Sequence, residues 1–214
     1  MKIEELTEKT SKLLLLSKKT LEKFEPAKNN LNGNLKYWRK NGDLIRLRNG
    51  LYVLKERYDK EGDKDKYLEF ISCQLVQPSY LSLEYVMAKY QLLTEAVYSY
   101  TAITVNRTRS ILNDLGAFRY YSVTNKLFTG YKVKYFYGAP IWEATKEKAI
   151  FDFLYLRFFR NQPINEKVID DLRINWIEVS RVEWRKVLSF GKLCQSKKVK
   201  EALLLITQMY YKDI

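Results

Sequence analysis

The chain of 214 residues contains no histidine. Histidine is the commonest general base and the commonest zinc ligand near neutral pH, so Ser-His-Asp triads, Cys–His pairs and two-histidine metal motifs are excluded. The two cysteines, Cys73 and Cys194, are far apart and form neither a disulfide framework nor a metal-binding pattern. The eight glycines are dispersed and build no phosphate-binding loop. We therefore expect no enzyme, no cofactor and no metal.

Long apolar runs are also missing. Runs such as the four leucines of residues 13–16 are far short of the roughly 20 residues that cross a bilayer. The first residues are acidic and amphipathic, unlike the basic start and apolar stretch of a signal peptide. These features predict a cytoplasmic protein with no membrane partner.

Positive charge is abundant and unevenly distributed. The net charge is +13 and the sequence pI is near 9.5. Residues 28–57 hold eight Lys or Arg and two Asp or Glu. Such a concentrated basic segment favours contact with phosphates, although a well-solvated basic surface would explain the total charge equally well.

The first 55 residues have the pattern of a small α+β domain. Apolar spacing and turn formers predict helices at residues 4–16, 18–24 and 31–40, with Ser17 as the cap of the second and Asn41-Gly42 as the end of the third. After Asp43 the apolar period changes to two, and Asn49-Gly50 separates two short strands. Because Asn-Gly tolerates the positive φ angles of a type I′ turn, this segment predicts a β-hairpin.

Beyond a hydrophilic linker at residues 58–66, the sequence predicts a second, mixed domain. Helices are expected at 65–75, 83–90, after Thr145, and at 165–173, 181–191 and 196–211, with strands at 102–105, 117–123 and 131–137. The predicted fold class is α+β. It has a winged helix-turn-helix domain at residues 1–58, followed by a mixed α/β domain at 66–214 that ends in helices.

The third helix and the hairpin form the most specific constellation. A helix beside an Arg-x-Arg hairpin is the arrangement in which a helix enters the major groove of DNA while a wing touches the flanking backbone. Asn and Arg pair with base edges, and Lys and Tyr suit phosphates. Strand alternation would bury Leu47 and turn the arginines outward. The predicted DNA-binding residues are Asn34, Lys36, Tyr37, Arg39 and Lys40 on the helix, and Arg46, Arg48 and Asn49 on the wing. A basic helix and hairpin that merely join two parts of one domain remain an alternative.

The second domain is rich in aromatic residues, which leaves two interpretations. They could stack on nucleic-acid bases, but aromatic residues in strands more often pack in a core or across strands. We favour core packing. The residues concerned are Tyr98, Tyr100, Phe118, Tyr120, Tyr121, Phe128, Tyr131, Tyr135, Phe136 and Tyr137.

Four stretches, in order along the chain, resemble the AbiEi family of type IV toxin–antitoxin and abortive-infection systems. Residues 35–52 (LKYWRKNGDLIRLRNGLY) are similar to the winged head of that family. Residues 79–87 (SYLSLEYVM) are similar to its Ile-Ser-x-x-Ser-Ala-Leu helix start, with Glu84-Tyr85 in place of the small pair. Residues 124–131 (TNKLFTGY) resemble its Leu-Phe-x-Gly-Tyr element, and residues 143–152 (EATKEKAIFD) its Ala-x-x-Glu-Lys-Ala-x-x-Asp helix. Residues 160–214 are too generic to compare.

The resemblance implies an antitoxin that represses its own operon through double-stranded operator DNA, expected to contain inverted repeats. It also implies a functional link to a nucleotidyltransferase-like toxin, which such antitoxins counter without forming a stable complex. The alternatives are a stand-alone winged-helix regulator without a toxin and an antitoxin that binds its toxin directly. A nucleotidyl-transferring enzyme is a distant third, because the only Asp-x-Asp lies in the linker and no Gly-Ser pair is present.

Overall fold

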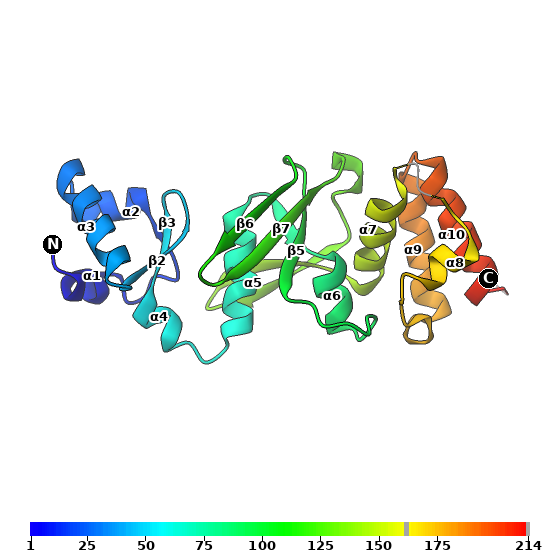
Figure 1. The fold of residues 1–214 in the computed structure, drawn as a ribbon, viewed down its shortest axis with the longest axis horizontal. Coiled ribbons are helices and arrows are strands. Elements are labelled where there is room, and N and C mark those ends of the chain that lie inside the picture. Colours follow the sequence, from blue (N-terminus) through cyan, green and yellow to red (C-terminus); the bar gives the residue numbers. More distant parts are fainter. Residues whose placement is uncertain (161–162, 213–214) are drawn as a thin grey trace. The chain divides into compact units, whose positions relative to one another are not determined.

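A computed structural model describes residues 1–160 and 163–212. The chain forms two compact units (Figure 1). The N-terminal unit comprises Met1–Leu68 and Ile111–Gly116, and the C-terminal unit comprises the remaining described residues. The fold is α+β, as expected: helices with a small antiparallel sheet, then a mixed sheet, then helices. The expected domain limits of 1–58 and 66–214 stay a prediction.

The N-terminal unit places three helices beside a three-stranded antiparallel sheet. The sheet has the order β1-β3-β2 in the described residues, so the last strand in sequence is the central one. Its helical face buries one cluster of leucines around Trp38 and Tyr52. The elements are α1 (Ile3–Thr10), β1 (Leu16–Ser17), α2 (Lys18–Phe24), α3 (Lys28–Lys40), β2 (Leu44–Arg48), β3 (Leu51–Leu54) and α4 (Lys55–Asp59).

Helix α2 and its cap were predicted correctly, since Ser17 Oγ accepts a hydrogen bond from Thr20 N at 3.0 Å. The first helix was predicted too long. It ends at Thr10, Leu13 is exposed, and Leu16 is buried in β1. The leucine spacing suggested a longer helix because Leu16, although it lies in a strand, packs in the same core as Leu6 of α1. The linker predicted at 58–66 is partly helical, as α4 and the start of α5 (Lys64–Leu75) occupy its ends.

The C-terminal unit contains most of a mixed six-stranded sheet, whose order is β6-β7-β5-β4-β9-β8 in the described residues; residues 111–113 of β6 and the first residue of β7 are grouped with the N-terminal unit. Strands β5 and β7 pair in parallel, as do β4 and β9, whereas β8 and β9 are antiparallel. Helix α6 packs on β5 and α7, and α7, α9 and α10 pack together (Figure 1). The strands are β4 (Ser79–Leu81), β5 (Ser99–Thr104), β6 (Arg109–Asn113), β7 (Gly116–Ser122), β8 (Tyr131–Phe136) and β9 (Ala139–Ala144). The helices are α6 (Leu83–Lys89), α7 (Lys146–Phe158), α8 (Glu166–Asp170), α9 (Arg181–Leu193) and α10 (Lys197–Tyr210), with 3₁₀ turns at Asn125–Leu127 and Trp176–Glu178.

Strands β4, β6 and β9 are absent from the sequence-based expectations. The four helices expected after Thr145 are present, with shifted ends. Of the aromatic residues, Phe118, Tyr120 and Phe136 are buried, as favoured. Tyr98, at 90% exposure, Tyr135 and Tyr137 lie on the surface instead.

A fully buried polar cluster joins the sheet to helix α7. Asp152 Oδ2 accepts hydrogen bonds from Tyr80 Oη at 3.0 Å and Ser82 Oγ at 2.8 Å. Its other carboxylate oxygen pairs with Lys148 Nζ, one helical turn earlier. Burial raises the pKa of Asp152, although Lys148 and the two hydroxyls act in the opposite direction. Because Ser82 Oγ is used here, it does not cap helix α6, although Ser82 is the N-cap residue as predicted.

Candidate nucleic-acid interface

Helix α3 is positioned by three apolar side chains and by its C-terminal turn. Leu31, Leu35 and Trp38 are buried on one face. At the end, Gly42 takes a φ of +81°, Gly42 N donates to Arg39 O at 3.2 Å, and Asp43 N donates to Trp38 O at 2.9 Å. These two bonds form a Schellman motif, which needs the positive φ that glycine adopts freely. The predicted stop at Asn41-Gly42 is confirmed, and it turns the chain directly into β2.

The outer face of α3 carries three of the five residues predicted on this helix. At 3.6 residues per turn, Lys36 and Lys40 point away from the buried face, and Tyr37 beside them is 61% exposed. Arg39 is also exposed, on a flank of the helix. Asn34 lies on the other flank and is half-buried next to the core, so it presents less of its amide than expected.

Two further residues lie on this outer face, Asn29 and Gly33. Asn29 was missed because the predicted helix began at residue 31, whereas the helix begins at Lys28. Gly33 lies inside the predicted helix, but it has no side chain to mark it as a contact residue. Pro26 could have signalled the earlier start, since proline is common just before or at the first helical turn. Apart from its chain neighbours and the adjacent helix backbone, nothing lies within 4 Å of the position that a Cβ on Gly33 would occupy, so this part of the helix surface is open.

The hairpin of β2 and β3 is present, but its turn differs from the expected type I′. Only Gly50 has a positive φ, at +73°, and the strand register shifts between Arg46 and Arg48. A glycine at the left-handed position next to an extra residue indicates a bulged turn. The bulge interrupts the alternation on which the prediction for the two arginines was based.

The bulge gives the two arginines different environments. Arg48 is exposed, whereas Arg46 is half-buried and its Nη2 donates a hydrogen bond to Asn49 Oδ1. Leu47 is buried as predicted, but it is not part of the cluster that α1, α2 and α3 form with the sheet. Of the three predicted wing residues, Arg48 and Asn49 are therefore the more accessible.

The cations of α3, like the lysines of α2, have no carboxylate partner among the described residues, unlike those of α1 and α4. In α1, Lys9 pairs with Glu5. In α4 and its C-cap, Lys55 pairs with Asp59 and Lys60 pairs with Glu56. The two residues of each pair are four positions apart. Helix α3 contains no acidic residue. Among the described residues, its four cations and the two arginines of β2 form no ion pair with a carboxylate; the helix cations are Lys28, Lys36, Arg39 and Lys40. Positive charge on this face is consequently free to meet an external anion.

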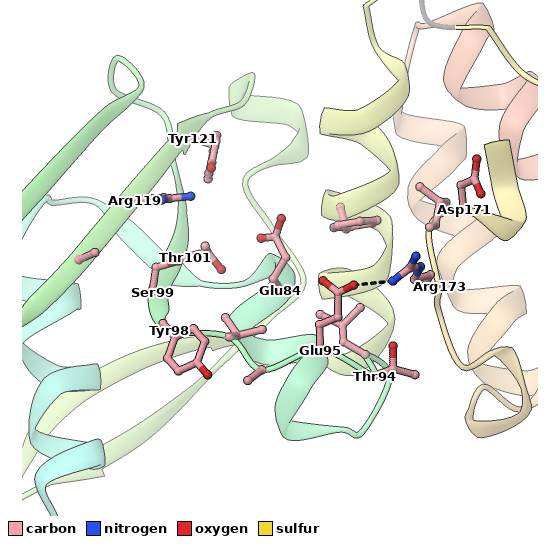
Figure 2. Close-up of a pocket in the computed structure, with 16 residues that line it drawn as sticks. Glu84, Thr94, Glu95, Tyr98, Ser99, Thr101, Arg119, Tyr121, Asp171 and Arg173 are labelled. Atoms are coloured by element: carbon pink, nitrogen blue, oxygen red, sulfur yellow. Dashed lines mark hydrogen bonds and ion pairs between the residues drawn. The ribbon is translucent and has the colours of Figure 1, made fainter.

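The C-terminal unit contains a separate open cavity of about 720 Å³ (Figure 2). Its wall includes Arg119 and Tyr121 of β7, Glu84 of α6 and Phe153 of α7. Figure 2 shows Glu84 between strand β7 and helix α7. At its edge, Arg173 Nη1 and Glu95 Oε1 pair at 2.9 Å. The sequence analysis identified no cavity here, because its lining comes from segments far apart in the chain.

Comparison with protein-family models and with curated proteins finds no match to this chain. The described residues contain no cluster of three or more His, Cys, Asp or Glu able to hold a metal ion. Within the same residues, no helix has the length and apolar character that a bilayer span requires.

Proposed function

We propose that the chain is a sequence-specific DNA-binding protein whose N-terminal unit is a winged helix-turn-helix. Helix α3 is the recognition helix, α2 is the preceding helix, and the β2–β3 hairpin is the wing. The element order α1-β1-α2-α3-β2-β3 with sheet order β1-β3-β2 supports this assignment. The observation that carries the proposal is the outer face of α3, which is exposed, basic and free of carboxylates.

In this proposal, α3 lies in the major groove and the hairpin contacts the adjacent backbone. Lys36, Lys40 and Arg48 meet phosphates, while Asn29 and Arg39 reach base edges. Tyr37 contributes a hydroxyl donor and an aromatic surface. We further propose that the protein represses its own operon by binding inverted repeats, and that it serves as the antitoxin to a nucleotidyltransferase-like toxin. These last two roles rest on the resemblance to the AbiEi family.

The test is binding to DNA from upstream of the protein's own gene, compared with unrelated DNA of equal length. Fluorescence anisotropy over a salt series gives both the affinity and the number of phosphate contacts. The expected result is tighter binding to the upstream DNA by about 10³-fold or more. Equal affinity for both DNAs would leave a non-specific basic protein and would overturn the proposal.

A double substitution on α3 tests whether this helix contacts the DNA. Lys36→Ala with Lys40→Ala should weaken binding to both DNAs and lower the salt slope by about two, because two phosphate contacts are lost. The matched control is Lys55→Ala with Lys60→Ala, which removes two exposed lysines that already have carboxylate partners. If the control pair weakens binding as much as the α3 pair, the recognition helix is wrongly assigned.

The antitoxin role is tested separately by co-expression with the neighbouring reading frame. Growth inhibition by that frame alone, relieved by the full chain, supports an antitoxin. Relief that persists with the Lys36→Ala, Lys40→Ala variant would place the antitoxin activity outside DNA binding. Co-purification of a stable complex would favour the alternative of direct toxin binding, and a neighbour without toxicity would favour the stand-alone regulator.

A further inference from the structure

The cavity of the C-terminal unit contains an unsatisfied charged group. Glu84 Oε2 is buried and accepts no hydrogen bond. Among the described residues, it is the one buried side-chain oxygen or nitrogen without a hydrogen-bond partner. Buried polar atoms in native proteins almost always have a partner, and leaving a carboxylate oxygen without one is unfavourable. Because Glu84 lines an open cavity, a bound ligand can supply the missing donor.

Cations with no carboxylate partner lie in the same region. Arg119 lines the cavity from β7, and Arg157 of α7 lines an adjoining cavity of about 420 Å³ that shares Glu84, Tyr121 and Phe153. Neither arginine forms an ion pair in the part of the chain that the structure describes. In contrast, Arg173 is neutralised by Glu95. Asp171 also lines both cavities. The two cavities therefore offer two carboxylates, of which Glu84 has a buried oxygen that needs a donor, two guanidinium groups that can hold an anion, and the aromatic rings of Tyr121 and Phe153.

We propose that this region binds a nucleotide whose base carries an amino group. The amino group donates to Glu84 Oε2, the phosphate meets Arg119 or Arg157, and the base lies against Tyr121 and Phe153. The larger cavity, of about 720 Å³, falls within the roughly 300–1,000 Å³ of small-molecule pockets, which is larger than a free amino acid needs. A purely apolar ligand would leave Glu84 unsatisfied, and a metal ion would leave the two arginines without an anion. The proposal goes beyond DNA binding and does not depend on it.

Calorimetric titration of the full chain with AMP, GMP, CMP, UMP and inorganic phosphate tests the proposal. UMP is the discriminating ligand, because its base has no amino group and its one ring donor, N3–H, is flanked by two carbonyl oxygens that a carboxylate repels. At least one amino-bearing nucleotide should bind with a Kd below about 1 mM and about tenfold or more tighter than UMP. The matching nucleoside, which lacks the phosphate, should bind more weakly than its nucleotide.

Two substitutions test the two ends of the site separately. Glu84→Met should abolish the preference over UMP, and Arg119→Ala should reduce the difference between nucleotide and nucleoside. Arg109→Ala on the neighbouring strand β6 is the control, since Arg109 is exposed and does not line the cavity. Glu84→Met should also leave the thermal midpoint unchanged or higher, because it removes an unpartnered buried oxygen; a structural role for Glu84 would lower the midpoint instead.

Three results would overturn the proposal. The first is no binding of any nucleotide at about 5 mM, well above the expected Kd, which would mean that only water occupies the site. The second is binding of inorganic phosphate as tight as that of the nucleotides, which would reduce the site to an anion pocket. The third is binding that neither Glu84→Met nor Arg119→Ala alters, which would place the ligand elsewhere.

Discussion

Two sets of cations, one in each unit, have opposite environments. In the N-terminal unit, the cations of α3 and β2 are exposed or half-buried and have no carboxylate partner. In the C-terminal unit, Lys148 is buried against Asp152, and Lys89 and Lys134 each lie 2.5 Å from the Glu143 carboxylate, whose side chain is 1% exposed. A lysine is therefore left without a carboxylate partner on the surface of one unit and forms part of the internal structure of the other. The net charge of a segment becomes informative only once the partners of its cations are known.

Among the tests of this contrast, we expect the largest effect from Asp152→Ala, which should lower the stability of the C-terminal unit. This change leaves Lys148 buried without its anion and also removes the acceptor of Tyr80 and Ser82. We expect the free energy of unfolding to fall by about 3–5 kcal/mol, as for one-sided removal of a buried ion pair. Urea denaturation measures the change. Lys9→Ala, which breaks the exposed pair with Glu5 in α1, is the control and should not shift the midpoint. A small effect of Asp152→Ala would show that the cluster contributes little to stability.

For the cations of the N-terminal unit that have no carboxylate partner, we expect the opposite result: substitution of the wing arginines should weaken DNA binding and leave the free energy of unfolding unchanged. Arg46→Ala with Arg48→Ala should weaken DNA binding roughly 10- to 100-fold near 0.1 M salt and reduce the salt slope by about two. Of the single changes, Arg48→Ala should have the larger effect, because Arg46 is half-buried and bonded to Asn49. Anisotropy and urea denaturation on the same samples check both parts. Unchanged affinity in the double variant would remove the hairpin from the interface.

A pH titration sharpens the description of the buried charges. Burial acts to raise the pKa of Glu143, but the hydrogen bonds from Lys134 and Lys89 outweigh burial and hold the pKa below its ordinary value of 4.5. A carboxyl with a lowered pKa stabilises the fold above the unfolded-state pKa, and this stabilisation is lost as the pH falls through the folded-state pKa. Glu143→Gln should thus be less stable than the wild type at pH 7, with the gap closing below about pH 4.5.

The control for this titration is Glu166→Gln, at an exposed position in the first turn of α8. Its unfolding curve should follow the wild type over the whole pH range. A gap between wild type and Glu143→Gln that stays constant down to pH 3 would mean that Glu143 is not ionised in the folded protein.

The smallest expected effect is that of Gly33→Ala in the middle of α3. Alanine stabilises an exposed helix interior by about 0.5–1 kcal/mol relative to glycine, and the open surface at Gly33 accommodates the methyl group. Urea denaturation should show this gain. Weaker DNA binding despite the gain would indicate that the DNA approaches α3 closely at Gly33. Unchanged binding would place the contact surface nearer Lys36 and Lys40.

The N-terminal unit is the part of the fold that the sequence predicts best. Helix α2 has the predicted ends, the stop of α3 is marked by Asn41-Gly42, and the hairpin by Asn49-Gly50. These signals are local, because caps and glycine turns are fixed by residues within one turn of one another. Errors arise where the local pattern is ambiguous. Leu16 continues the leucine spacing of α1 but lies in a strand, and the bulge after Arg46 has no sequence signal beyond the glycine.

The sheet and the cavity of the C-terminal unit could not be predicted in the same way. Strand β4 has three residues and β6 is mostly exposed, so neither has an apolar period to detect. The polar cluster joins Tyr80 and Ser82 to Asp152, and the cavity joins Glu84 to Arg119 and Phe153. Such contacts depend on tertiary packing across many residues, which periodicity and capping rules do not describe.

The strand orders also have a consequence for how the chain folds. The central strand β3 of the small sheet ends at Leu54, so every element of that sheet lies within one short stretch of sequence. The large sheet needs the pairing of Leu81 with Glu143, which closes only after a long intervening segment. Chains with local contacts fold faster than chains with distant ones. During synthesis, the N-terminal three-stranded sheet can therefore form while the strands of the larger sheet still lack their partners.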